Sequence, residues 1–353
     1  MIDPHVHLRD DRQASKETLV HGLSVASFIG DQWLFDMPNC DPPLIDRTSI
    51  DLRLQRAREA EALVKAQTGR AMRYSLYAGL TSDEGQIGNV VEAWRKLFPR
   101  VVGLKLFAGN STGGMGQVSL EAQRHIYGQL ARDGFDGVLA VHCEKESLLC
   151  PEREDPPDFS SHSDARPPEA EIESVRDQIR LSGEAGFQGT LHIAHVSTIE
   201  TVRLVEQARS AGRKITMGVT PHHLLLDRTL SKERGRYAKM NPPLRSPEER
   251  KQLFQAVLEG AIDWVETDHA PHTLKDKEKG ASGIPGFCGV LLLLAELRKA
   301  GLSEKRLQEL FGGNVLKTFK LDEIPITLPA AEETSDLVAM AASCYPFDSY
   351  RQG

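Results

Sequence analysis

The stretch VVGLKLF, residues 101–107, has the pattern of a short β-strand with apolar side chains on both faces, and the Gly-, Asn-, Ser- and Thr-rich run AGNSTGG follows it at once. Strands with two apolar faces are typical of parallel sheets that helices cover on both sides. Lys105 stands in the middle of this strand, although lysine is seldom fully buried without a partner. Its ordinary explanations are a side chain that reaches solvent from a strand end, or one that pairs with a carboxylate.

Seven further strand-like segments lie before and after this one, and stretches of helical period separate them. These segments are residues 2–8, 33–39, 72–80, 137–144, 190–197, 215–224 and 261–270. Eight strands that alternate with helices in a chain of 353 residues predict an α/β fold of the (β/α)8 TIM-barrel type. An open dinucleotide-binding sheet is disfavoured, because no GxGxxG follows the first strand.

The alternation of strands and helices stops near Ile324. We therefore assign residues 1–323 to the barrel and residues 324–353 to a short C-terminal extension, which we expect to wrap the barrel as short strands or coil. Residues 151–168 are rich in proline and charged side chains. They predict a long loop after the fifth strand, on the side of a barrel where active sites lie.

Composition disfavours several classes of protein. A formal net charge of −7 gives no support to nucleic-acid binding, and no apolar run reaches the length of about 18 residues that a membrane span needs. The five cysteines are widely spaced and form no CxxC pair, which argues against a disulfide framework and a thiolate zinc site. The opening residues MIDPHVHLRD lack the features of a secretory signal, so a cytoplasmic location is the default expectation.

Six residues able to carry chemistry fall at the ends of the predicted strands: His5, His7, Lys105, His142, His195 and Asp268. Alternate residues on a strand share a face, so His5 and His7 suit one metal ion. Each residue alone has a plainer explanation, such as a half-buried histidine pair, a core imidazole bonded to a carbonyl, or a loop-capping aspartate. Their joint occurrence at the carboxyl ends of barrel strands favours a catalytic metal site.

Lys105 can join such a set only after a chemical change, because an ammonium group has no lone pair. Desolvation and neighbouring cations lower the pKa of a lysine and so favour its neutral amine. The neutral amine can add carbon dioxide and become a carbamate, an anionic ligand with two oxygens that can bridge two metal ions. This hypothesis explains a lysine inside an apolar strand.

Several motifs together resemble the dihydroorotase family of the amidohydrolase superfamily, over nearly the whole chain. They are DPHVHLRD, MPN, GLKLF, VHCE, ARPPEAE, HIAHVST, VTPHHL, KMNPPLR, TDHAPH and CYPFD. HxH alone marks only the superfamily, whereas HLR, MPN, KMNPPLR and TDHAPH together mark the family. The resemblance implies a hydrolase of cyclic amides that interconverts N-carbamoyl-L-aspartate and L-dihydroorotate in pyrimidine (UMP) biosynthesis.

The resemblance also implies two Zn²⁺ ions per chain and a carbon-dioxide-derived carbamate, although other divalent metals could use the same ligands. The implied ligands are His5, His7 and Asp268 for the more buried ion, His142 and His195 for the more exposed ion, and carboxylated Lys105 as a bridge beside a hydroxide. His195 is chosen over His192 because it directly precedes the hydroxyl-rich turn, and strand alternation would send His192 to the opposite face.

Catalytic and substrate-binding roles are carried over in the same way. Asp268 would move the proton between the hydroxide and the amide nitrogen. The implied substrate contacts are Arg9, Asn39 and His272 to the carboxylate, and Asn241, Thr112 and the backbone around Phe287 to the ring amides. Whether residues 110–116 close over the substrate or form an ordinary surface loop is left open by their composition.

Two alternatives to this function are considered. Another cyclic amidase, such as an allantoinase or hydantoinase, would use the same metals, but the HLR, MPN and APH motifs favour a substrate with a carboxylate. A non-catalytic dihydroorotase-like partner of aspartate transcarbamoylase is expected to have lost ligands, whereas the full set is present here. Association with that transferase and a homo-oligomer both remain open. No full side β-sandwich is expected, because the chain starts at the HxH strand.

Overall fold

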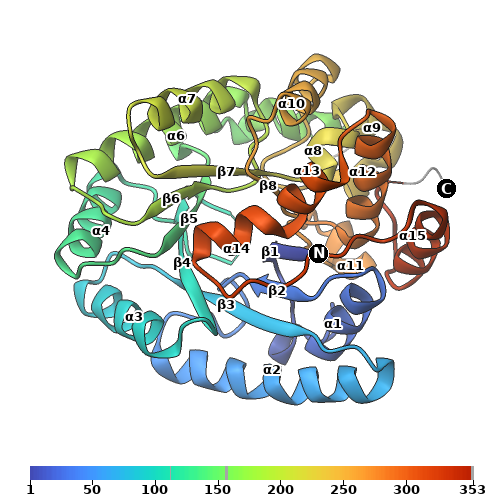
Figure 1. Ribbon diagram of the computed structural model, residues 1–353. Coiled ribbons are helices and arrows are strands. Elements are labelled where there is room, and N and C mark those ends of the chain that lie inside the picture. Colours follow the sequence, from blue (N-terminus) through green and yellow to red (C-terminus); the bar gives the residue numbers. More distant parts are fainter. Residues whose placement is uncertain (112, 156–157, 351–353) are drawn as a thin grey trace.

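The computed structural model describes residues 1–111, 113–155 and 158–350. Eight parallel strands form one sheet in the order β1 to β8 (Figure 1). The strands are β1 (Ile2–Val6), β2 (Trp33–Asp36), β3 (Arg73–Gly79), β4 (Val101–Ala108), β5 (Val138–Cys143), β6 (Thr190–Ile193), β7 (Ile215–Val219) and β8 (Trp264–Val265). Each pairs in parallel with the next, which confirms the predicted (β/α)8 barrel, although most strands end earlier than the sequence pattern suggested.

The last strand meets the first through residues at the end of β1 and just after β8. Val6 pairs with His269 in parallel. The backbone N–H of His7 donates to the carbonyl of His269 at 2.7 Å, and that of Asp268 donates to the carbonyl of His5 at 3.0 Å. These bonds close the barrel and bring the HxH and TDH segments together.

Eight longer helices follow the strands around the outside of the barrel (Figure 1). They are α1 (Leu19–Phe28), α2 (Arg47–Thr68), α3 (Glu84–Leu97), α4 (Leu120–Arg132), α6 (Pro168–Glu184), α7 (Ile199–Ser210), α10 (Pro247–Glu259) and α12 (Phe287–Lys299). The shorter helices are α5 (His162–Ala165), α8 (Pro221–Leu225), α9 (Arg228–Arg234), α11 (Leu274–Glu278), α13 (Glu304–Gln308) and α14 (Asn314–Phe319). The helix α15 (Thr334–Ser343), 10 residues long like α1, lies in the C-terminal extension. Side-chain caps begin several of them: Thr18, Asp83 and Ser119 each accept an N–H from the first turn.

The barrel interior is filled with large apolar side chains and closed at one end by α14 (Figure 1). Phe319 of α14 lies edge-on against Phe35 with ring centroids 5.2 Å apart, and it also contacts Tyr77 and Trp264. Residues at the starts of strands, such as Ile2, belong to the same cluster. The amino-terminal end of the barrel is therefore packed, which leaves the carboxyl ends of the strands for a site.

The C-terminal extension differs from the expectation of short strands or coil. Residues Thr334–Ser343 form α15, which packs against α12, and the described part of the extension contains no strand. The sequence TSDLVAMAAS is rich in helix-forming Ala, Leu and Met, and Val338 and Ala341 bury one side of the helix. The boundary between residues 323 and 324 stays a prediction.

The described residues also bear on a side β-sandwich and on membrane-spanning helices. All strands among them belong to the barrel, so they form no side β-sandwich. None of the helices in the described ranges combines the length and apolar character that crossing a membrane requires.

Candidate metal centre and active site

A pocket opens at the carboxyl ends of the strands, and it gathers all six predicted metal ligands. Its lining residues are His5, His7, Arg9, Asn39, Lys105, Phe107, Ser111, His142, His195, Asn241, Asp268, Ala270, Ser282 and Gly283. Three of the predicted substrate contacts, Arg9, Asn39 and Asn241, are among them. Thr112 lies outside the described residues.

One group of ligand atoms joins the end of β1 to the segment after β8. Asp268 Oδ1 lies 2.9 Å from His7 Nε2 and 3.5 Å from His5 Nε2. Ligand atoms of the three residues all lie within 4.8 Å of one another. Asp268 has a left-handed backbone conformation with φ of 50°, which turns its carboxylate back toward β1. This arrangement of two imidazoles and one carboxylate can hold a divalent cation.

The side-chain amide of Asn39 sets the protonation of Nδ1 of His7. His7 Nδ1 lies 2.6 Å from Oδ1 of Asn39, and because an amide oxygen only accepts, Nδ1 carries the proton. His7 Nε2 then faces Oδ1 of Asp268, and a metal ion bound there would take the place of the proton between these two atoms. Burial alone would raise the pKa of Asp268, but the hydrogen bond and charge of His7 and the charge of His5 hold it well below its usual value. Asp268 is therefore an ionised carboxylate.

A second group of ligand atoms joins β5 to the turn after β6. Nδ1 of His142 and Nε2 of His195 lie 3.1 Å apart, and both side chains are buried. Burial, above all, lowers the pKa of both imidazoles, and neighbouring cations lower it further. Two neutral imidazole nitrogens that face each other in a pocket are suited to share a metal ion.

Lys105 lies between these two groups, and neither ordinary explanation for it holds. Its side chain is 0% exposed, so it does not reach solvent. Its Nζ atom has no hydrogen-bond partner within the described ranges, and no carboxylate there lies within ion-pair distance. Burial lowers its pKa to about 8, although Glu266 and Asp268 favour the charged form. Lys105 therefore places in the pocket an amine of reduced basicity, which lies 5.1 Å from the ring centroid of Phe107 and has no hydrogen-bond or ion-pair partner among the described residues.

His192 differs from the sequence expectation. It does not lie on the opposite face of β6, because its ring stacks on Trp264 inside the barrel at 4.3 Å, and its Nε2 lies 3.0 Å from Oε2 of Glu266. Both histidines of HIAHVST face inward because His195 has a φ of 40°, which turns the chain after β6. His195 lines the pocket and His192 does not.

Of the predicted carboxylate-binding residues, Arg9 and Asn39 line the pocket, and His272 lies beside Arg9. Arg9 is almost fully buried, and its Nε donates to the carbonyl of Pro271 at 3.3 Å. His272 lies beside it, with Nε2 3.5 Å from Nη2 of Arg9 and 3.0 Å from the carbonyl of Ser282. Burial and the charge of Arg9 lower the pKa of His272 to about 2, so its ring is neutral.

Two of the predicted substrate contacts are not brought into the pocket lining. His272 bonds to the Ser282 carbonyl instead, and Phe287 stacks on His269 with ring centroids 3.9 Å apart. Asn241 does line the pocket, and its Oδ1 accepts from Nε2 of His162 at 2.8 Å. The substrate-binding roles of these residues stay predictions.

Sequence reasoning missed the charged residues that hold the second group. Glu144 accepts two hydrogen bonds from Arg166, at 2.9 and 2.6 Å, and its Oε2 lies 3.0 Å from Nε2 of His142. Arg166 also donates to the carbonyl of Asn110, where the glycine-rich segment begins. The VHCE and ARPPEAE motifs contained this pair, but spacing alone does not show which glutamate meets which arginine.

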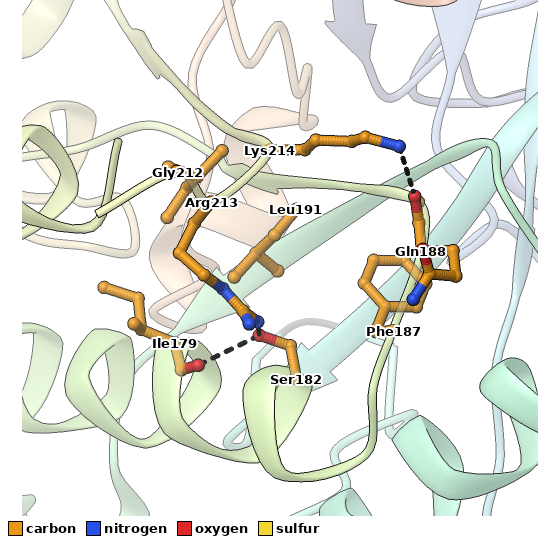
Figure 2. Close-up of a pocket in the computed structure, with 10 residues that line it drawn as sticks. Ile179, Ser182, Phe187, Gln188, Leu191, Gly212, Arg213 and Lys214 are labelled. Atoms are coloured by element: carbon orange, nitrogen blue, oxygen red, sulfur yellow. Dashed lines mark hydrogen bonds between the residues drawn. The ribbon is translucent and has the colours of Figure 1, made fainter. Parts of the chain in front are cut away.

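A second cavity, of about 140 Å³, lies at the opposite end of the barrel between α6 and the starts of β6 and β7. Its two cations already have protein partners (Figure 2). Arg213 donates to Oγ of Ser182 at 3.0 Å, and Lys214 donates to the carbonyl of Gln188 at 3.1 Å. This cavity contains none of the predicted site residues.

Comparisons with known proteins concern the chain as a whole. No family model matches the chain. The chain is 33% identical over 302 residues to a protein named dihydroorotase from Thermococcus kodakarensis, covering 86% of this chain and 63% of that one. It is 34% identical over 331 residues to a protein named dihydroorotase from Halobacterium salinarum, covering 91% of this chain and 72% of that one. The chain thus spans somewhat less than two thirds of the first of these relatives.

Two solved structures are similar to this fold. An L-hydantoinase (dihydropyrimidinase) from Arthrobacter aurescens superposes with a TM-score of 0.80 at 25% identity, over 93% of this chain and 72% of that chain. A dihydroorotase from Campylobacter jejuni superposes with a TM-score of 0.68 at 19% identity, over 92% of this chain and 84% of that chain. The second likeness concerns the fold alone.

Proposed function

Because the chain belongs to the dihydroorotase family, we propose that it catalyses the reversible closure of N-carbamoyl-L-aspartate to L-dihydroorotate, a step of pyrimidine (UMP) biosynthesis. The observation that carries this proposal is the pocket in which the other five predicted ligands meet around Lys105, whose amine has no hydrogen-bond partner among the described residues. The relatives' name supplies the substrate, and the buried Arg9 in the same pocket supplies a partner for its carboxylate.

The residues of the pocket fit two divalent cations. His5, His7 and Asp268 would hold one ion, and His142 and His195 the other. Zn²⁺ suits a set dominated by imidazole, although Mn²⁺ or Co²⁺ can use similar ligands. When bound, such ions lower the pKa of a shared water and polarise a substrate carbonyl.

A carbamate on Lys105 would complete the two sets. The neutral amine of Lys105 forms a bond to the carbon of CO2 and loses a proton, which creates an anion with two oxygens. Burial favours the neutral amine, as the lowered pKa of about 8 indicates, and Nζ has no hydrogen bond within the described residues that the reaction would break. The carbamate would then span the two groups of ligands.

Asp268 is the residue that we assign to proton transfer. In ring closure its ionised carboxylate removes the proton from the ureido nitrogen, and in hydrolysis it returns a proton to that nitrogen as the ring opens. The contact of its Oδ1 with Nε2 of His7 at 2.9 Å and the left-handed turn after β8 hold the carboxylate at the pocket. A positioned acid/base of this kind contributes about 10²- to 10⁴-fold to a rate.

Arg9 and Asn39 would bind the carboxylate that stays outside the ring. The planar guanidinium of arginine can donate two parallel hydrogen bonds to a carboxylate. Both residues line the pocket, and they follow β1 and β2. His142 and His195 belong to β5 and to the turn after β6, which lie across the barrel from β1 and β2. With the substrate carboxylate bound by Arg9 and Asn39, the reacting amide would lie nearer the metal-binding residues.

The similarity to the structure of an L-hydantoinase supports a second candidate function, the hydrolysis of another cyclic amide. The buried Arg9 favours dihydroorotate, since a ring without a carboxylate would leave this cation without a substrate partner. A non-catalytic role beside aspartate transcarbamoylase is disfavoured by the complete ligand set. The proposal includes Zn²⁺ as the resident metal and a cytoplasmic location.

Hydrolysis of two related rings tests this assignment. Dihydroorotate and dihydrouracil share the same ring and differ only in the carboxylate. We expect the zinc-loaded protein to hydrolyse dihydroorotate with a kcat/KM at least 100-fold above that for dihydrouracil, on the order of one buried charge-assisted contact. Equal rates, or a preference for dihydrouracil or hydantoin, would favour the alternative amidase.

A further inference from the structure

Glu266 is a buried carboxylate beside the pocket that the proposed mechanism does not use. It follows β8 directly, lies two residues before Asp268, and is 1% exposed. Its Oε2 accepts hydrogen bonds from Nε2 of His192 and from Nε1 of Trp264, both at 3.0 Å. These two bonds hold one side of the carboxylate and aim the other side, Oε1, toward the pocket residues.

The Oε1 atom of Glu266 reaches one residue from each ligand group. It accepts the backbone N–H of His195 at 2.6 Å, and it lies 3.5 Å from Nδ1 of His5. His5 Nδ1 makes no hydrogen bond in the described part of the chain, while His5 Nε2 faces Asp268. Histidines that bind a metal through one nitrogen usually donate the other to a carboxylate or carbonyl.

The neighbouring strand leaves room for this carboxylate. Residue 218 of β7 is a glycine, and a Cβ atom there would lie 2.5 Å from Cδ and 2.6 Å from Oε2 of Glu266. Such distances are too short for any side chain at position 218 unless the carboxylate moves. The place of Glu266 in the barrel wall therefore depends on a specific residue of another strand.

Charge balance gives Glu266 a second effect. Two divalent ions bring four positive charges, and Asp268, a carbamate on Lys105 and one deprotonated water would balance three of them. In a buried site an unbalanced charge is costly. Glu266 supplies the remaining negative charge without occupying a position in the pocket lining.

We propose that Glu266 is a positioning residue of the metal centre, which orients the imidazole of His5, holds the backbone of His195 and raises the affinity for two divalent cations. This inference rests on the proposed metal centre. It concerns the support of the ligands rather than the ligands themselves, and it assigns no contact between Glu266 and substrate.

Zinc affinity measured by competition with a chromophoric chelator tests the inference. Glu266→Gln keeps the shape and removes the charge, and we expect it to weaken zinc binding by about 10- to 100-fold, the range found for lost carboxylate support. Asp263→Asn is the matched control. Asp263 precedes β8 and accepts the N–H of Met217 at 2.8 Å and a bond from Arg209 at 2.6 Å, but it lies at the far end of the strand. Its zinc affinity is expected to equal that of the wild type.

Gly218→Ala gives a second route that leaves Glu266 in place. The added methyl group must displace the carboxylate, so zinc affinity should fall in this variant as well. In the double variant with Glu266→Gln, the two losses should be clearly less than additive, because both act through one carboxylate. Cobalt-loaded samples should show altered visible absorption in both single variants, since the ligand geometry changes, and an unaltered spectrum in Asp263→Asn.

The outcomes separate this inference from the proposed function. A wild-type protein that binds no zinc overturns the proposed metal centre. A wild type that binds two ions, with Glu266→Gln and Gly218→Ala binding as tightly and showing the wild-type cobalt spectrum, overturns the role of Glu266 alone. If Glu266→Gln fails to fold, the affinity and spectrum of Gly218→Ala decide the question.

Discussion

The hydroxyl group of Tyr345 donates a 2.8 Å hydrogen bond to Oε1 of Glu17, which ties the C-terminal extension to the segment between β1 and α1. Glu17 also lies 3.3 Å from Nε2 of His269, whose Nδ1 accepts the N–H of Gly286 at 3.0 Å. Because Nδ1 accepts, Nε2 carries the proton and donates to Glu17. This buried chain of contacts ends at the residue next to Asp268, so the extension supports the backbone of the proposed acid/base.

Replacing Tyr345 by Phe removes one hydrogen bond to a buried charged group. We expect the free energy of unfolding to fall by about 1.5–3 kcal/mol and kcat to fall several-fold, with zinc content unchanged, because the ligands themselves stay in place. Urea denaturation, steady-state kinetics and elemental analysis measure the three quantities. Tyr237→Phe serves as the control. The backbone carbonyl of Tyr237 accepts a hydrogen bond from Ser349 of the same extension, and no hydrogen bond links Tyr237 to Glu17 within the described residues. A Tyr345→Phe variant with wild-type stability and kcat would show that the extension gives no such support.

Lys105→Ala should lose metal and activity together, because the variant cannot form the carbamate. Added acetate or another short carboxylic acid should restore part of both by occupying the space of the carbamate. Lys277→Ala is the matched control: this lysine is equally buried, but its Nζ donates to the carbonyls of Lys239, Ala281 and Gly283. Added carboxylic acids should not raise the metal content or the activity of Lys277→Ala. Full metal content in Lys105→Ala would contradict the carbamate bridge.

Arg9→Lys should impair recognition of the substrate carboxylate and little else. A lysine keeps the charge but cannot offer two parallel hydrogen bonds, so kcat/KM for dihydroorotate should fall by about 10- to 100-fold. Hydrolysis of dihydrouracil, which lacks the carboxylate, should change far less, and this ring is the internal control. Equal losses on both rings would assign Arg9 a structural role instead.

The sequence predicted the barrel because each strand is a short apolar run, and the ligands stood out because charged residues are rare in such runs. VVGLKLF is the clearest case, since β4 spans it and Lys105 is fully buried there. Features that depend on several strands were not predictable. Glu266 looks like an ordinary residue before TDH, and its environment exists only because Gly218 of the adjacent strand leaves space for it.

Two misjudged elements show the limit of local patterns. The run from 261 to 270 suggested a long strand, but β8 spans only Trp264–Val265, because Asp268 adopts a left-handed conformation and bonds to β1. His192 faces inward from β6 itself, and the left-handed turn at His195 brings that later histidine to the inside as well. A left-handed conformation is uncommon outside glycine, and although Asp and His adopt it more often than most residues, residue type alone does not locate it. Asp268 and His195 both line the pocket.

Ring closure of N-carbamoyl-L-aspartate, measured together with the metal content of the same samples, tests the proposed function most directly. We predict that the wild type holds about two divalent ions per chain and closes the ring, while Asp268→Asn is slower by about 10²- to 10⁴-fold. A wild type that is loaded with metal but forms no dihydroorotate, or an Asp268→Asn variant that turns over at the wild-type rate, would contradict the account.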